Sequence, residues 1–252
     1  MKKIIATVTL LFAIQLQHQA MANGFLDDAE LKARIGYNIG GTAPIGLPAT
    51  IRKIDSYTLT PSIMFGADIM KRFQSNWGLM VGLRFENKGM DAGAVTKNYH
   101  MEVTKGGSKM DGVYTGHIEQ KVQEWMFTLP IFATYRLGKK TTLKAGPYIS
   151  LLVSKDFSGY VYDGYLRQGD PTGPKVTMGT AENERATYDF SDDMRHFQVG
   201  VAVGADWQIY KQFGISADLN WGLNGIFKKD FKTVEQTLYP IYGTIGLFYK
   251  LK

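Results

Sequence analysis

Two-residue alternation of apolar and polar side chains recurs in eight stretches of this chain and limits what it can fold into. In residues 197–209 every odd-numbered side chain is apolar, whereas the even-numbered ones are small or polar. Successive side chains of a β-strand point to opposite faces, so the pattern predicts a strand with one apolar face. The eight expected strands are residues 31–40, 57–70, 77–86, 122–136, 141–154, 197–209, 213–224 and 238–251.

Aromatic side chains lie near both ends of the apolar face in five of these strands. The five pairs are Trp77 and Phe85, Trp125 and Tyr135, Phe197 and Trp207, Phe213 and Trp221, and Tyr239 and Tyr249. Their spacing projects to about 20–25 Å along the axis of a barrel of tilted strands, which matches the apolar band between two aromatic girdles. In a soluble β-sandwich, no physical boundary would favour aromatic residues at two fixed positions along the strands. The sequence therefore predicts an all-β fold, an eight-stranded antiparallel up-and-down transmembrane β-barrel.

Short and long connections alternate between the expected strands. The short ones are residues 73–76, 138–140 and 211–212, and the long ones are residues 41–56, 89–120, 155–195 and 225–237. Short turns on one side and long loops on the other are typical of outer-membrane barrels, whose long loops face outward from the cell. We expect the segment 155–195 to be either mobile or an exposed binding element.

The first 22 residues have the three parts of a secretory signal peptide. Lys2 and Lys3 are followed by an apolar run at residues 4–14 and by a small-x-small cleavage site that ends at Ala22. A membrane-spanning helix needs about 20 apolar residues, and glutamines interrupt this run before that length. We expect export, cleavage near Ala22 and a single barrel domain, residues 23–252, in the cell outer membrane.

The composition excludes several classes of protein. The chain has no cysteine, which excludes a lipid-anchored cysteine, a disulfide framework and a thiolate metal site. Its formal net charge is +6, to which Lys2 and Lys3 contribute, and no basic stretch is long enough to bind nucleic acid. The mean hydropathy of −0.16 suits a soluble protein, but equally a barrel that is apolar on one face only.

Charged side chains at even-numbered positions are expected in the barrel lumen. They are Lys32, Arg34, Asp68, Arg84, Glu86, Glu124, Arg136, Lys144, Asp206 and Asp218. The interior of an eight-stranded barrel is just wide enough to be filled by side chains, and an unpaired buried charge costs several kcal/mol. We therefore expect a closed, ion-paired plug rather than a polar conduit. An arginine at lipid-facing Val201 should impair insertion, and Gly200→Ser on the lumen side should be mild.

Candidates for catalysis are few. Beyond the signal peptide the histidines are His100, His117 and His196. A nucleophile and base could be His117 with Thr115, or His196 with Ser191, but neither spacing is diagnostic. We expect no enzymatic activity.

No cofactor or metal site is predicted. Asp189, Asp192 and Asp193 lie close together, yet the segment lacks the regular alternation and the glycine of a calcium loop. No glycine-rich phosphate-binding loop is present.

Three stretches carry a resemblance to a known family. They are FTLPIFATYRLGKKTTLKAGPYIS at 127–150, FQVGVAVGADWQI at 197–209 and YGTIGLFYKLK at 242–252. The chain resembles the outer-membrane β-barrel domain family that is abundant in Bacteroidetes and includes PorT-like and small porin-like barrels. The likeness extends over essentially all of residues 23–252. It implies outer-membrane lipids as surroundings and, for PorT-like relatives, protein partners in an envelope secretion machinery.

The final strand also resembles a barrel-assembly signal. Thr244, Gly246, Tyr249 and Leu251 fit its frame, although the chain ends in Lys252 instead of an aromatic residue. This likeness implies recognition by the barrel-assembly machinery. Our hypothesis is a non-enzymatic structural or surface-binding protein that acts through its long outer loops. The alternatives are a PorT-like secretion accessory and, less favoured, a lipid-modifying outer-membrane enzyme.

Overall fold

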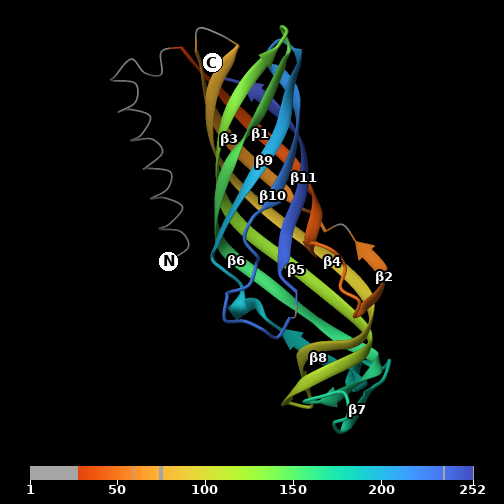
Figure 1. Cartoon of the computed structure of the whole chain (residues 1–252). Coiled ribbons are helices and arrows are strands. Elements are labelled where there is room, and N and C mark those ends of the chain that lie inside the picture. The colour runs from red at the N-terminus through yellow and green to blue at the C-terminus, as the bar shows by residue number, and fades with distance from the viewer. Residues whose placement is uncertain (1–27, 59, 74–75, 235, 252) are drawn as a thin grey trace, which may run out of the picture.

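Eight antiparallel strands form a closed barrel (Figure 1). The computed structural model describes residues 28–251 except 59, 74–75 and 235, so the expected signal peptide lies outside the described residues. The strands of the ring are β1 (Ala29–Pro44), β3 (Ile63–Arg72), β4 (Trp77–Lys105), β5 (Ser108–Leu137), β6 (Thr141–Gln168), β9 (Phe197–Tyr210), β10 (Phe213–Gly222) and β11 (Leu238–Lys250). Pairing of β1 with β11 closes the ring and confirms the predicted fold.

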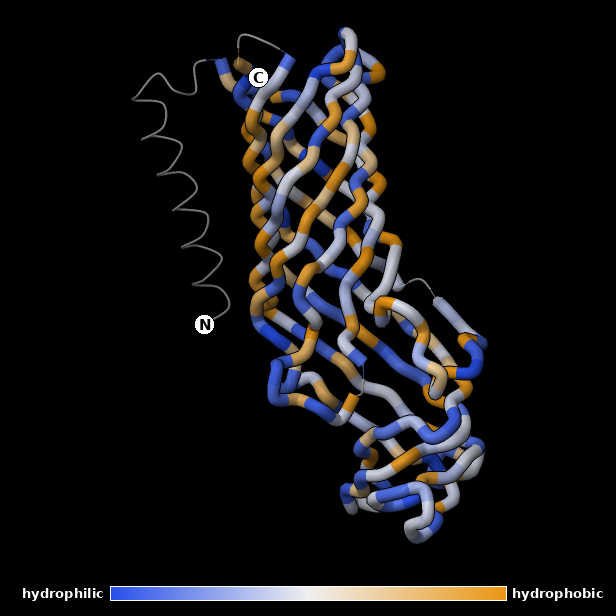
Figure 2. The backbone as a smooth tube through the Cα atoms, in the orientation of Figure 1, coloured by the Kyte–Doolittle hydropathy of each residue, from blue (hydrophilic) through white to orange (hydrophobic). Residues whose placement is uncertain are grey.

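The two-residue alternation separates the outside of the barrel wall from the lumen. Ile35 is 50% exposed, whereas its neighbour Arg34 is 4% exposed. Val203 and Ala202 on β9 show the same contrast, at 54% and 2%. Apolar residues recur along the outside of the cylinder (Figure 2). Odd-numbered side chains of the barrel therefore face outward and even-numbered ones inward, as the pattern predicts.

The expected strand 57–70 is wrong at its start. Tyr57 belongs to a separate strand, β2 (Ile51–Thr58), which pairs with β4 outside the ring. Pro61 has no amide hydrogen and interrupts the ladder. The buried side chain of Asn87 replaces the missing backbone hydrogen bonds there. It accepts from the Ile63 amide at 2.7 Å and donates to the Pro61 carbonyl at 2.8 Å.

Three of the four expected long loops are mostly strand. In place of a loop at 41–56, β1 continues to Pro44 and β2 begins at Ile51. In place of a loop at 89–120, β4 continues to Lys105 and β5 begins at Ser108. In place of a loop at 155–195, β6 continues to Gln168 and is followed by β7 (Lys175–Met178), β8 (Ala186–Asp189) and two short 3-10 helices, η1 (Glu182–Glu184) and η2 (Ser191–Asp193). The sequence of these segments lacks the strong alternation of the barrel strands, which is why it predicts loops there.

The continuing strands form an extension beyond the barrel, which we define as residues 89–121, 156–168 and 175–189. β8 pairs with β6 along four residues and with β4 at Thr104 and Thr187, so the extension curls onto itself. Its apolar core includes Met101, Tyr114, Ile118, Phe157, Val161, Leu166, Ala186 and Tyr188, and Phe190, Phe227 and Leu238 pack in the same cluster. The extension is thus a packed unit at the end of the barrel opposite the short turns (Figure 1).

The lumen leaves no room for a side chain at position 200, although this position faces inward. A Cβ added there would overlap the ring of Tyr148 and the carbonyl oxygen of Trp221. The expectation that Gly200→Ser is mild is therefore wrong, because the lumen at this height is filled by Tyr148.

Candidate functional site

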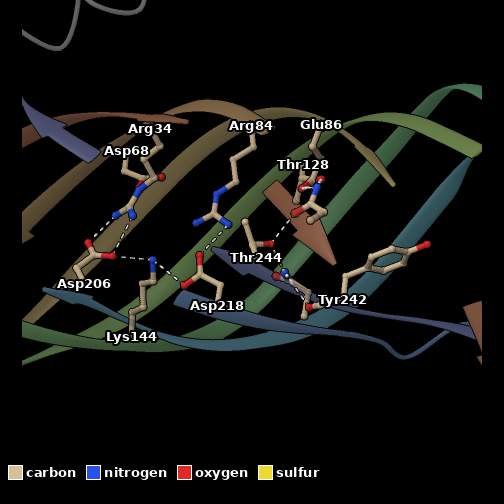
Figure 3. A network of polar contacts seen from close by, with 12 residues as sticks. Arg34, Asp68, Arg84, Glu86, Thr128, Lys144, Asp206, Asp218, Tyr242 and Thr244 are labelled. Carbon is tan, nitrogen blue, oxygen red and sulfur yellow. Dashed lines mark hydrogen bonds and ion pairs between the residues drawn. The ribbon is translucent and has the colours of Figure 1, made fainter. Parts of the chain in front are cut away.

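A network of charged side chains lies in the lumen (Figure 3), and Asp206 has three cationic partners in it. Asp206 accepts from Lys32 at 3.1 Å, from Arg34 at 2.9 and 2.6 Å, and from Lys144 at 2.8 Å. Lys144 also lies 2.8 Å from Asp218. These side chains come from β1, β6, β9 and β10, so the network joins strands on several sides of the ring.

Further ion pairs extend this network. Arg34 donates to Asp68 on β3, and Arg84 on β4 lies 3.3 Å from Asp218. All of these groups are buried. Buried charges of opposite sign must pair closely to offset the loss of their hydration.

A second polar cluster lies nearer the extension. Glu86 accepts from Thr128 at 2.7 Å and from Asn38 at 3.2 Å, and it lies 3.2 Å from the Lys88 ammonium. The Lys88 ammonium is also 5.5 and 5.6 Å from the ring centres of Tyr148 and Tyr242. This arrangement satisfies a buried ammonium with one carboxylate and two aromatic faces.

Two of the expected lumen ion-pair residues have other partners. Glu124 is fully buried and accepts from the neutral amide of Gln198 at 2.7 Å. Arg136 is half-buried at the end of β5 and donates to the carbonyl oxygens of Gly138 and Lys139 in the next turn. Arg136 therefore lies outside the ion-paired network, because its strand ends there. Lys88 was not among the predicted lumen ion pairs. Its even-numbered position, which places it on the lumen side, could have identified it.

The expected girdle residues lie at the two ends of the barrel wall. The short-turn end has Trp77, Tyr135, Trp207, Phe213 and Tyr249, and the other end has Phe85, Trp125, Phe197, Trp221 and Tyr239. Rings from adjacent strands pack together, with Trp77 and Tyr135 centred 5.0 Å apart and Phe85 and Trp125 5.3 Å apart. The described residues contain no helix long and apolar enough to cross a membrane.

A cleft of about 690 Å³ lies on the extension. Its lining comes from β4, β5, β6 and β8 and includes Asp91, Glu102, Lys109, Glu119, Lys121, Tyr160, Tyr188 and Asp189. Lys109 pairs with Glu102 at 2.9 Å. The lining then has three further carboxylates, Asp91, Glu119 and Asp189, and one further ammonium group, Lys121. One oxygen of Asp91 is buried and has no hydrogen-bond partner in the described part of the chain.

Hydrogen bonds fix the polar groups of this cleft. Burial raises the pKa of the Tyr188 phenol well above its usual value, and the phenol donates to the carbonyl oxygen of Glu119 at 2.9 Å. Hydrogen bonds from the Ser191 hydroxyl and amide lower the pKa of Asp189. Tyr188 therefore stays a donor and Asp189 stays ionised at neutral pH.

The candidate nucleophiles have other roles. The Thr115 hydroxyl accepts from the amide of Asn98 at 3.0 Å, and the Ser191 hydroxyl accepts from the amide of Phe157 at 3.0 Å. His117 lies 3.7 Å from both Asp55 and Asp163 and stacks on Tyr162. Among the residues that the structure describes, no group of three His, Cys, Asp or Glu side chains could hold a metal ion.

Comparisons with known proteins place this barrel in a family. The sequence profile of the family described as "Outer membrane protein beta-barrel domain" matches residues 16–228. A search of curated proteins finds no significant match. Among solved structures, Ail of Yersinia pestis is 11% identical with a TM-score of 0.39, over 89% of this chain and 99% of Ail. Neisserial surface protein A is 9% identical with a TM-score of 0.36, over 89% of this chain and 97% of its own. Because the family match spans most of the sequence, the chain belongs to the outer membrane protein beta-barrel domain family and is an outer-membrane β-barrel protein.

Proposed function

We propose that this protein is a non-enzymatic surface-binding protein whose extension presents a ligand cleft outside the cell. In outer-membrane barrels the short turns face the periplasm and the longer connections face outward. The short turns lie at one end of this barrel and the extension at the other (Figure 1). The extension therefore faces the exterior, where a cleft is accessible to solutes and to other surfaces.

The observation that supports binding is that the cleft is built by a unit packed on an apolar core. Loops that only connect strands need no apolar core, whereas the extension buries Tyr114, Phe157, Val161 and Leu166 almost completely. Such packing holds the cleft walls in one geometry, which lowers the entropy cost of binding. The cleft volume of about 690 Å³ lies within the range of small-molecule and short-peptide sites.

The charge of the cleft favours a cationic ligand. Asp91, Glu119 and Asp189 have no paired cation within the cleft, and only Lys121 offsets them. Tyr160 lies on the same lining, with the Arg185 guanidinium over its ring at 4.7 Å from the ring centre. We infer that the ligand carries closely spaced positive charges, as a lysine-rich peptide does.

Binding of a fluorescent tetralysine peptide tests this proposal. The full chain would be placed in phosphatidylcholine nanodiscs and peptide binding measured by fluorescence anisotropy. The double variant Asp91→Asn with Glu119→Gln should weaken binding by about tenfold, as expected for the loss of two attractive charges. A matched variant, Asp230→Asn with Glu182→Gln, removes the same charge from exposed sites outside the cleft. Equal affinities of the two variants would contradict a cationic ligand in the cleft.

A second candidate is a PorT-like accessory of envelope protein secretion, and the edge of β2 favours it. Among the strands that the structure describes, β2 pairs with β4 alone, and seven of its eight residues are exposed. A free strand edge can pair with a strand of another protein. If this is the function, large envelope proteins should co-purify with the wild type but not with Ser56→Pro, which removes an amide from that strand.

A further inference from the structure

The barrel wall has a gap between the end of β1 and β2. β1 pairs with β3 only as far as Tyr37 and Ile63, whereas β1 continues to Pro44 beside β11. β4 beyond Asp91 pairs with β2 instead of with β3. Among the described residues, no strand ladder joins the end of β1 to β2.

An apolar groove of about 440 Å³ occupies this gap. Gly41 of β1 and Ile54 and Tyr57 of β2 line its outer part, and Met90 and Phe157 line its inner part. The Tyr57 hydroxyl donates to the carbonyl oxygen of Gly40, so a phenol bridges the two strands. A Cβ at position 41 would lie 2.6 Å from the sulfur of Met90, so glycine allows Met90 to pack against β1 at this point of the lining.

The groove begins at the height of the outer aromatic girdle. Gly41 pairs with Ile241, and Ile241 pairs with the girdle residue Trp221. Ile241 itself lines the groove. The groove is therefore continuous with the lipid-facing surface at the boundary of the hydrocarbon layer. From there it leads inward to Phe157 in the core of the extension.

We propose that this groove binds one acyl chain of an anionic membrane lipid, which enters sideways from the outer leaflet. Leu47 and Ile54 at the mouth are 61% and 53% exposed, and an acyl chain would cover them. Arg52 and Lys53 are exposed on β2 between groove-lining Ile51 and Ile54, where they can meet a negatively charged headgroup. The groove adjoins the acidic cleft and shares Gln120, Tyr188 and Phe190 with it. The two sites are tested with different ligands and different variants, so either proposal can fail without the other.

Native mass spectrometry tests lipid binding directly. The full chain would be released from nanodiscs of mixed phosphatidylcholine and phosphatidylglycerol, under activation that strips loosely held lipid. The wild type should retain one lipid, with phosphatidylglycerol enriched over its share of the disc. A spread of lipid numbers without a preferred single adduct would overturn the proposal.

Variants of the groove make the test specific. Ala94→Phe fills the groove and should lower lipid retention by about tenfold or more. Ala133→Phe is the matched control, because Ala133 is exposed on the barrel wall and does not line the groove. Ile54→Asp should have the same effect as Ala94→Phe, with Ile45→Asp, 65% exposed and outside the lining, as its control.

Two outcomes would reject the acyl chain as occupant. One is unchanged lipid retention in Ile54→Asp, which alters an exposed side chain and is expected to fold. The other is a lipid-free dimer in the wild type that Ile54→Asp converts to a monomer, which would make a second copy of the chain the occupant. Heat-modifiable gel mobility shows that each variant has folded.

Discussion

Arg34 on β1 and Asp206 on β9 form a two-point contact across the lumen, with Nη1 2.9 Å from Oδ1 and Nη2 2.6 Å from Oδ2. β10 and β11 separate the two strands along the ring. A bidentate contact of this kind fixes both distance and orientation. The pair therefore ties together parts of the wall that share no backbone ladder.

Asp206→Asn should destabilise the barrel strongly. The change keeps the side-chain size but leaves Lys32, Arg34 and Lys144 without a shared carboxylate. Loss of one partner from a buried ionic group costs about 3–5 kcal/mol. Urea unfolding in lipid vesicles, followed by tryptophan fluorescence, would measure it against exposed Asp230→Asn. A difference below about 1 kcal/mol would show that the network is solvated.

Arginine on the lipid-facing wall should have a depth-dependent effect. Val201 is 42% exposed and lies between the girdle residues Phe197 and Trp207. Val201→Arg should cost about 2–4 kcal/mol, whereas Ile209→Arg, beyond Trp207, should cost about 0–1 kcal/mol. Insertion yield into vesicles and urea unfolding provide the readout. Equal tolerance at both positions would mean that this face does not meet hydrocarbon.

Asn87→Ala should loosen the start of β3. The asparagine side chain replaces the ladder hydrogen bonds that Pro61 interrupts, and the Ala variant leaves a buried amide unsatisfied. The expected loss is about 1–3 kcal/mol. Hydrogen exchange at the Ile63 amide should accelerate in Asn87→Ala but stay unchanged in exposed Asn183→Ala. Unchanged protection of Ile63 in both would argue against this role.

Phe157→Ala should unfold the extension and spare the barrel. Phe157 is 1% exposed, and its ring centre lies 6.4 Å from that of Tyr188 in the extension and 4.8 Å from that of Phe227 in the connection between β10 and β11. Truncation of such a ring costs about 3–5 kcal/mol. Limited proteolysis should cut the extension of the variant, while heat-modifiable mobility of the barrel persists. Loss of both together would show that the two parts fold as one unit.

The barrel should show no stable open conductance for ions through its lumen. Lys144 and Asp218 meet at 2.8 Å, and Phe132 and Tyr148 fill the space beside the network. Planar-bilayer recordings of the wild type are expected to lack the large, stable steps of an open porin. A reproducible open level would contradict the plug.

Much of the barrel could be predicted from the sequence because lipid imposes a strict period of two on every spanning strand. That period places Trp207 on the outside and Asp206 in the lumen without knowledge of any contact. The two-residue period is lost beyond the outer aromatic residues. There β4, β5 and β6 continue past the barrel and pack on the apolar core of the extension. There the polar composition of residues 89–120 resembles that of a loop.

Which side chains face the lumen and which face lipid could be read from the sequence, because a strand between two different surroundings has a local two-residue pattern. Which charged groups pair, and where the wall has a gap, follows only from the three-dimensional arrangement of the strands. Arg34 and Asp206 lie 172 positions apart, and Tyr57 of β2 bonds to Gly40 of β1 although no ladder joins these strands in the described part of the chain. Such contacts depend on strand order and register, and neither is encoded in the local alternation of side chains.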